Sequence, residues 1–192
     1  MKIKMQLLSD AIFGNGVSVP GGEDMSVLCD KDGFPYYKGG TLKGVFREEL
    51  YRYLEWIGKE EKEIEEIVIR LLGKGGNGEE ITPTKLTFSD VTLSGAVKEK
   101  VLQEVGTMAG YADLITDLLT HTRTLTAIEE DGMVKEGSLR SLRCVNKGLY
   151  FYSTIFCAEE DEILVREALA MVKWIGSMRN RGFGKVKITV EE

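Results

Sequence analysis

The chain has 192 residues, of which 43% are hydrophobic and 29% are charged, and its formal net charge is −6. This length suits one domain with elaborations, residues 1–192, which can bury roughly 70% of the surface that its unfolded chain exposes. No apolar run approaches membrane-spanning length, and the first residues lack the apolar block of a signal peptide. The three cysteines, Cys29, Cys144 and Cys157, have no C-x-x-C spacing, which favours reduced thiols over a disulfide or zinc framework. We therefore expect a cytoplasmic protein with no membrane partner.

The negative net charge argues at first against a nucleic-acid partner. Its distribution weakens that objection, because five glutamates fall within residues 60–66 while basic residues gather elsewhere. Such an acidic run is typical of a solvated helix face. Local potential rather than net charge governs a groove, so a polyanion remains a possible ligand.

The first half of the chain predicts a strand, two helices and a strand. Met1–Leu8 alternates polar and apolar residues, as a strand does. Apolar residues then recur at three- and four-residue spacing from Leu42 to Ile57, with Thr41 as a plausible N-cap, which predicts a core-facing helix. Lys59–Leu72 predicts a second, strongly charged helix, and Lys85–Leu93 a second strand.

Residues 94–147 show no single period, and we interpret them as an insertion. The segment contains a possible helix at 111–119 and a β-like stretch ending at Ile128. Charged residues and glycines make Glu129–Gly137 a turn or mobile tip before the stretch Ser138–Val145.

The last part of the chain predicts a strand, a helix and a strand. Gly148–Cys157 is apolar on both sides, which is typical of a central strand. An acidic first turn starts a helix that ends at Gly176, and Val186–Val190 alternates as the last strand. The resulting order is βαββαβ, which predicts an α+β fold: a ferredoxin-like (RRM-like) antiparallel sheet with two helices on one face.

A glycine-rich basic stretch joins that helix to the last strand. Gly176–Ile188 combines glycines, which let the main chain approach a phosphate, with cations that a core does not require. Its candidate RNA-binding residues are Arg179, Arg181, Gly182, Gly184 and Lys185. The alternative is a helix C-cap followed by a turn, and the stretch alone does not separate the two.

Two further groups of cations could hold phosphates. One lies where a helix start already favours phosphate, and consists of Lys38, Lys43 and Arg47. The other lies in the insertion, and consists of Arg123, Arg140 and Arg143. The alternatives are an ordinary basic helix face and a solvated hairpin.

Asp24 is the candidate for chemistry. A carboxylate beside Gly21 and Gly22 can bind Mg²⁺ or orient a ribose 2′-hydroxyl for attack on the neighbouring phosphate. The alternative is that Asp24 only keeps a loop soluble.

Several stretches, taken in order, resemble the RAMP superfamily of CRISPR-associated proteins, and most closely the repeated backbone subunit of type III effector complexes. They are G-G-E-D at Gly21–Asp24, F-P-Y-Y-K-G-G-T-L-K-G-V-F-R at Phe34–Arg47 and L-T-F-S-D at Leu86–Asp90. They continue with the segment His121–Leu139, V-N-K-G-L-Y-F at Val145–Phe151 and R-G-F-G-K-V-K-I at Arg181–Ile188. Singly these motifs are weak, but their order is specific and spans nearly the whole chain.

The resemblance implies a subunit that polymerises along guide (CRISPR) RNA with other effector-complex subunits and meets target RNA. It makes residues 94–147 a thumb-like insertion, and it makes Asp24 the residue that cleaves target RNA with Mg²⁺ or another divalent metal. Two alternatives remain open. The chain could be a purely structural RNA-binding subunit, or a metal-independent endonuclease that processes guide precursors through His121.

Overall fold

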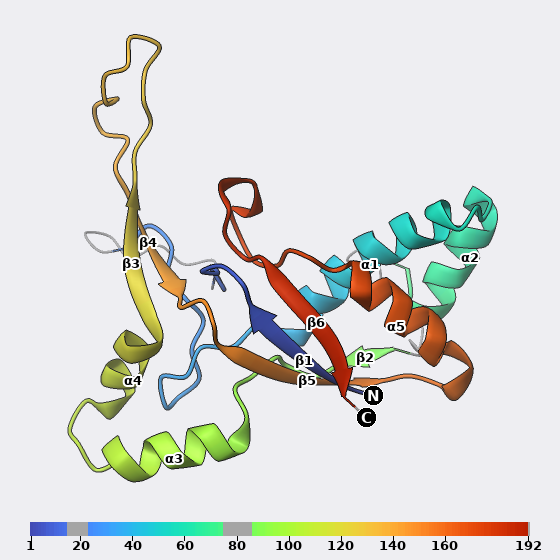
Figure 1. Ribbon diagram of the computed structural model, residues 1–192, viewed down its shortest axis with the longest axis horizontal. Coiled ribbons are helices and arrows are strands. Elements are labelled where there is room, and N and C mark those ends of the chain that lie inside the picture. The colour runs from blue at the N-terminus through green and yellow to red at the C-terminus, as the bar shows by residue number, and fades with distance from the viewer. Residues whose placement is uncertain (15–22, 75–85, 192) are drawn as a thin grey trace.

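A computed structural model describes residues 1–14, 23–74 and 86–191 (Figure 1). Within these residues, four strands form an antiparallel sheet in the order β2-β5-β1-β6, and two more form a separate hairpin. The sheet strands are β1 (Lys2–Leu7), β2 (Thr87–Phe88), β5 (Tyr150–Phe156) and β6 (Val186–Glu191). The hairpin strands are β3 (Thr120–Leu125) and β4 (Arg140–Val145). The predicted α+β class with an antiparallel sheet is confirmed.

Five α-helices and two short 3-10 turns complete the described chain. The helices are α1 (Gly39–Trp56), α2 (Glu61–Leu72), α3 (Gly95–Val105), α4 (Tyr111–Leu119) and α5 (Glu162–Met171). The 3-10 turns are Glu159–Asp161 and Arg179–Arg181. The helices α1 and α5 lie side by side, α2 extends beyond α1, and the hairpin projects away from the sheet on the opposite side of the molecule (Figure 1).

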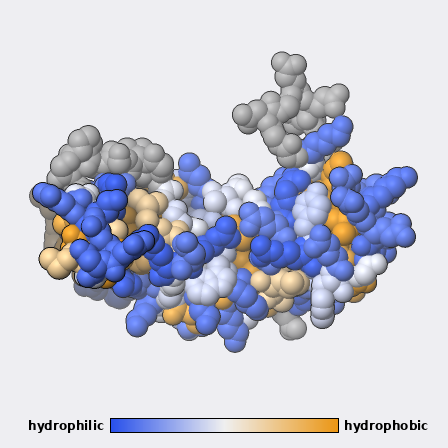
Figure 2. All heavy atoms as spheres, turned by 90° about the horizontal axis from the view of Figure 1, so that it is seen from above, coloured by the Kyte–Doolittle hydropathy of each residue, from blue (hydrophilic) through white to orange (hydrophobic). Residues whose placement is uncertain are grey.

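The main core lies between one face of the sheet and the helices α1 and α5. Alternation places Ile3 and Met5 of β1 on this face, where both are fully buried, together with Phe151 of β5. They share one apolar cluster with Phe46 of α1 and Ala168 of α5. The opposite face of the sheet carries Lys and Tyr side chains and is at least partly exposed. Seen from above, most of the surface is hydrophilic, and hydrophobic side chains appear only in small groups (Figure 2).

The starts and ends of two helices differ from the predicted ones. The helix α1 begins at Gly39, not after Thr41, and the carboxylate of Asp90 accepts a hydrogen bond of 2.8 Å from the Gly39 N–H. The helix α5 ends at Met171, not at Gly176, because the following residues become extended and pair with the chain before β6. The bonds run from Ile175 N–H to Gly184 O (2.8 Å) and from Val186 N–H to Lys173 O (2.8 Å).

The segment 94–147 contains α3, α4 and the β3–β4 hairpin before the chain returns to the sheet at β5. The hairpin begins at Thr120, four residues earlier than the predicted β-like stretch, because α4 ends at Leu119 and β3 follows it without a connecting loop. Beyond the paired strands, the Glu129 N–H donates to Met133 O at 2.8 Å in the expected turn. In the part of the chain that the structure describes, no helix has the length and apolar character needed to cross a membrane.

Candidate nucleic-acid interface

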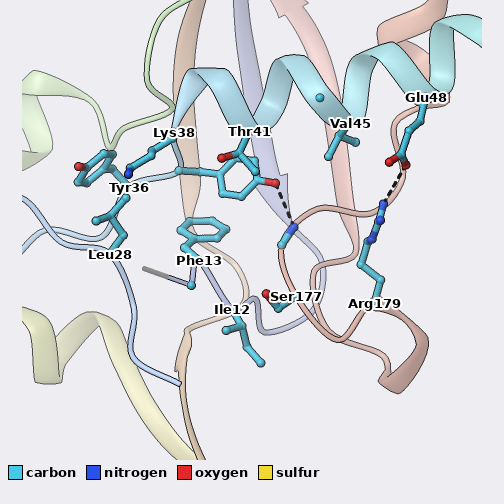
Figure 3. Close-up of a pocket in the computed structure, with 14 residues that line it drawn as sticks. Ile12, Phe13, Leu28, Tyr36, Lys38, Thr41, Val45, Glu48, Ser177 and Arg179 are labelled. Atoms are coloured by element: carbon cyan, nitrogen blue, oxygen red, sulfur yellow. Dashed lines mark hydrogen bonds and ion pairs between the residues drawn. The ribbon is translucent and has the colours of Figure 1, made fainter. Parts of the chain in front are cut away.

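A groove of about 350 Å³ lies where the start of α1 meets the segment after β1 and the glycine-rich stretch (Figure 3). One wall is α1, with Thr41, Val45 and Glu48, and the other wall carries Ser177 and Arg179. The groove therefore joins parts of the chain that are more than a hundred residues apart in sequence, as the separation of Thr41 from Ser177 shows.

Aromatic side chains form the floor of this groove. Phe13 and Tyr37 pack with their ring centroids 5.1 Å apart, and Phe13 also contacts Phe151 of the sheet at 5.4 Å. The Tyr37 hydroxyl accepts a hydrogen bond from the Gly176 N–H at 3.3 Å. Burial raises the pKa of Tyr37, so this hydroxyl stays protonated and keeps a proton to donate. The floor fixes the first residue of the glycine-rich stretch against α1.

The cations of the groove are Lys38, at the N-cap of α1, and Arg179. Lys38 is exposed and forms no ion pair with another described residue. Arg179 faces Glu48 at 3.6 Å, but both side chains are about half exposed, with 42% and 53% of their side-chain surface accessible. Exposed ion pairs of this kind contribute little stability, so a phosphate could replace Glu48 as the partner of Arg179.

The glycines of the stretch are held by the protein itself. The Gly184 N–H donates to Asp10 O at 2.7 Å, and the Gly182 N–H donates to Arg179 O at 3.2 Å. Both glycines have positive φ, and a Cβ on Gly184 would lie 1.8 Å from Ile175 O. Their conformation is therefore required by the turn and by close packing, and phosphate contact through them stays a prediction.

Phe183 anchors the stretch to the hairpin. Its ring is 2% exposed and lies in a small apolar cluster with Leu142 and Cys144 of β4. The guanidinium of Arg123, from β3, lies over the same ring at 5.0 Å. The structure thus brings Arg123 beside the glycine-rich stretch. Of the remaining predicted cations there, Arg181 and Lys185 are both exposed.

Asp24 lies along the edge of β4. Its N–H donates to Ser141 O at 2.8 Å, and its Oδ2 accepts from the Ser141 N–H at 2.7 Å. Its Oδ1 accepts from Arg140 at 3.1 Å. The Ser141 hydrogen bond, followed by the bond from Arg140, lowers the pKa of Asp24. The result is an ionised carboxylate whose two oxygens both already have donors.

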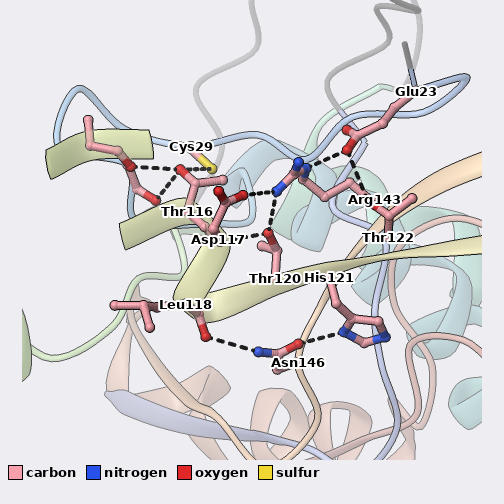
Figure 4. A network of polar contacts seen from close by, with 12 residues as sticks. Glu23, Cys29, Thr116, Asp117, Leu118, Thr120, His121, Thr122, Arg143 and Asn146 are labelled. Atoms are coloured by element: carbon pink, nitrogen blue, oxygen red, sulfur yellow. Dashed lines mark hydrogen bonds and ion pairs between the residues drawn. The ribbon is translucent and has the colours of Figure 1, made fainter. Parts of the chain in front are cut away.

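Arg143 is surrounded by acceptors (Figure 4). It donates to Glu23 at 2.6 Å, to Asp117 at 2.7 Å and to the Thr120 hydroxyl at 3.1 Å. Burial alone would lower the pKa of Arg143, but the bonds to Asp117 and Glu23 raise it. These hydrogen bonds fasten the 23–24 segment and α4 to the hairpin. Contact of Arg143 with RNA stays a prediction.

Lys43 and Arg47 do not line the groove, although they belong to α1, the helix that Lys38 precedes as N-cap. Arg47 donates to the carbonyl oxygens of Leu72 (3.1 Å) and Gly73 (2.9 Å), which closes the C-terminal end of α2. Burial, together with the neighbouring Arg47 charge, lowers the pKa of Lys43. The structure therefore separates these two residues from Lys38.

The residues around Asp24 could hold a divalent metal only together with a bound substrate, which would supply other ligands. Across residues 1–14, 23–74 and 86–191, no group of three Asp, Glu, His or Cys side chains could hold a metal ion. Mg²⁺ is commonly bound by one or two carboxylates, with substrate phosphates and waters as the other ligands. Asp24 could supply such a carboxylate once Arg140 moves away from Oδ1. Gly21 and Gly22, which precede it, lie outside the described residues.

Some residues of this interface were not identified from the sequence: Tyr37, Glu48, Ser177 and Phe183. The position of Phe183 between two glycines was a usable signal, because a large apolar residue in a basic turn needs a burial site. Glu48 and Ser177 gave no signal, since their roles come only from the chain segment that each one faces.

Comparison with known proteins identifies the family of this chain. Residues 4–187 match the family model of the RAMP superfamily. One similar solved chain belongs to the cryo-EM structure of the type III-B Cmr-beta bound to cognate target RNA, with a TM-score of 0.70, 15% identity, and 97% of this chain and 95% of that chain covered. A second belongs to the apo state of type III-B Cmr-beta, with a TM-score of 0.70, 16% identity, and 98% and 95% covered. No curated protein matches this sequence. The chain belongs to the RAMP superfamily.

Proposed function

We propose that this chain is a guide-RNA-binding backbone subunit of a type III CRISPR effector complex. The observation that carries the proposal is the groove in which Lys38 and Arg179, from distant parts of the sequence, flank the start of α1. Two cations beside a helix N-terminus, where the helix dipole favours negative charge, suit an RNA backbone, which is recognised through its phosphates. The similarity in fold to chains of Cmr-beta, one of them bound to target RNA, supports the same function.

We also propose that the sheet is ferredoxin-like. The strand order β2-β5-β1-β6, with α1 and α5 on one face, supports this topology. The partners are guide RNA, target RNA, other effector subunits and further copies of this chain along the guide. The place of action is the cytoplasm, where such RNA is met.

The groove is tested by a double variant, Lys38→Gln with Arg179→Gln. If each cation neutralises one phosphate, the slope of log affinity against log salt should fall by roughly 0.7 for each cation removed. Guide-RNA binding is measured by filter binding over a series of salt concentrations. The control is Lys62→Gln with Lys100→Gln, which removes the same charge from the exposed faces of α2 and α3. An unchanged slope in the groove variant, or an equal change in the control, would refute the groove.

We further propose that Asp24 takes part in metal-dependent cleavage of target RNA. Its lowered pKa supports the role, because a metal ligand must be ionised. A bound divalent metal would supply Lewis-acid polarisation of the phosphate. Asp24 would hold the metal, while Arg140, released from the carboxylate, would bind the RNA phosphate.

A second candidate is a purely structural subunit. It is favoured by the two hydrogen-bond donors that already satisfy Asp24, which would then only fasten the 23–24 segment to β4. This candidate predicts guide binding without target cleavage, even in the assembled wild-type complex.

A third candidate is a precursor-processing endonuclease that uses His121. Its Nδ1 lies 2.6 Å from the Asn146 amide oxygen, and its Nε2 lies 3.5 Å from Asp10, so the exposed ring has a fixed orientation. Under this hypothesis His121→Ala should abolish processing of a CRISPR repeat transcript in EDTA, because a general base is lost. Processing that continues in the variant eliminates the candidate. Asn146→Ala is the matched control, which frees the ring but keeps the imidazole.

A further inference from the structure

The face of the main sheet that points away from α1 and α5 is open. Along β5, Phe151, Ser153 and Ile155 are buried, whereas Tyr150, just before them, is 42% exposed, and Tyr152, between Phe151 and Ser153, is half-buried. In β1 the alternate residues Lys2, Lys4 and Gln6 occupy this open face. In β6 the exposed residues are Lys187, Thr189 and Glu191. Lysines and tyrosines therefore replace the apolar residues of the core face.

The strand register arranges these side chains in rows across the sheet. Gln6 of β1 pairs with Tyr150 on one side and with Lys187 on the other. In the next row, Lys4 pairs with Tyr152 and with Thr189. Each row thus contains one tyrosine and one lysine, and the lysine lies at the outer end of the first row and at the centre of the second. The two tyrosines follow each other at about 6.8 Å along β5, since they are two residues apart on one strand.

Five of the six residues in these two rows line a shallow hollow with a positive lining, whereas Tyr152 lines a neighbouring hollow together with Asp90 and Glu191. The hollow measures about 220 Å³ and is lined by Lys4, Gln6, Tyr150, Lys187 and Thr189. None of the described residues that line it is acidic, although the whole chain carries a net charge of −6. The Lys4 ammonium lies 4.6 Å from the centre of the Tyr150 ring, so charge and aromatic surface are already adjacent.

We propose that this face is a second RNA-binding surface, which takes a short single-stranded RNA segment. Bases stack on the Tyr150 and Tyr152 rings, and Lys4 and Lys187 contact the backbone phosphates on either side. Aromatic side chains interleaved with cations at strand spacing form a stacking platform that accepts any base, because every base has a π-face. The polar side chains of Gln6 and Thr189 add hydrogen bonds to the sugar or base edges.

This surface shares no lining residue with the groove at the start of α1, so the proposal does not rest on the groove. The cores of protein interfaces are depleted in charged residues such as lysine, whereas two lysines, Lys4 and Lys187, line this hollow. The charge of the lining is complementary to a polyanion, and this complementarity favours RNA as the occupant.

The test uses the full chain and a ten-nucleotide oligouridine that carries 5-iodouridine. Irradiation should cross-link the RNA to Tyr150 or Tyr152, and mass spectrometry of the digested protein identifies the residue. Affinity is measured by fluorescence anisotropy with the groove variant (Lys38→Gln, Arg179→Gln) as background. In that background, Tyr150→Ala with Tyr152→Ala should weaken binding about tenfold or more, whereas Tyr150→Phe should bind as the background does.

The matched control is Phe156→Ala. Phe156 is 62% exposed at the end of β5 on the same side of the strand, but it lies outside the hollow. Its variant should keep the affinity of the background. The proposal is overturned if cross-links fall only on groove residues, if the tyrosine variant binds unchanged, or if the open face instead buries a second copy of the chain. If RNA cross-links to groove residues but not to Tyr150 or Tyr152, the proposed role of the groove stands and only the proposed surface on the open face is refuted.

Discussion

Gly184→Ala is expected to lower the free energy of unfolding by about 3 kcal/mol or more, which is a large part of the stability of a domain. At φ +79° an alanine adopts a strained backbone, and its Cβ would lie 1.8 Å from the carbonyl oxygen of Ile175. This oxygen belongs to the backbone, so it cannot turn aside as a flexible side chain could. The Gly184 amide and carbonyl also bind Asp10 and Ile175, so a shift of Gly184 breaks contacts to two segments.

The matched control is Gly182→Ala. Gly182 has nearly the same φ, +84°, but no atom lies within 4 Å of an added Cβ, so only the backbone strain of about 1 kcal/mol is expected. Loss of glycine also restricts the unfolded chain, but this effect is shared by both variants and cancels in their difference. Urea unfolding, followed by circular dichroism, measures the two values. Equal destabilisation by both substitutions would show that close packing at Gly184 is not the cause.

The sheet and its helices could be predicted from the sequence because their signals are local. Alternation of polar and apolar residues places Ile3 and Met5 in the core, and three- and four-residue spacing does the same for Leu42 and Phe46. These patterns depend only on the period of each element. The four-stranded antiparallel order follows from the order of the elements along the chain, because right-handed crossovers place both helices on one face of the sheet.

The ends of elements depended on contacts between distant segments and could not be predicted. The apolar stripe of α5 continues through Val172 and Ile175, yet the helix ends at Met171, because residues 173–175 pair with residues 184–186. The same limit applies to the candidate site. Arg47 and Lys38 look alike as cations near a helix start, but only the position of α2 shows that Arg47 binds the carbonyl oxygens of Leu72 and Gly73. The motif that singled out Asp24 gave no indication of Ser141 as its partner.

The partners of Asp24 define what a catalytic role requires. Oδ2 receives a backbone N–H, which does not leave without moving β4, whereas Oδ1 receives a bond from Arg140, whose side chain is 62% exposed. An exposed ion pair of this kind exchanges partners at small cost. A target-RNA phosphate that attracts Arg140 would therefore free one oxygen for a metal, without any change in the fold.

Asp24→Asn is expected to reduce metal-dependent cleavage of target RNA by more than about a hundredfold, because the amide cannot replace an anionic metal ligand. Mutation of residues that only hydrogen-bond to a metal ligand already lowers metal affinity or activity by up to about a hundredfold. Guide binding should be unchanged, since the asparagine side-chain oxygen still accepts from the Ser141 N–H and keeps the segment in place. Cleavage is followed with labelled target RNA and Mg²⁺ in the assembled complex. Because the pKa of Asp24 is lowered, its carboxylate is ionised at any pH at or above the ordinary pKa of aspartate. Protonation of Asp24 should therefore not limit the cleavage rate of the wild-type complex in this pH range.

Two comparisons make the result decisive. Glu23→Gln changes the neighbouring carboxylate, which binds Arg143 and Thr122, and should leave the rate near that of the wild type if Asp24 alone holds the metal. Arg140→Gln should keep the carboxylate but weaken phosphate binding, so its loss of rate should be recovered at high target concentration. Undiminished cutting by Asp24→Asn would remove Asp24 from the mechanism, and no cutting by the wild-type complex would establish the structural subunit instead, with Arg140 and Ser141 serving only to fasten residues 23–24 to the hairpin.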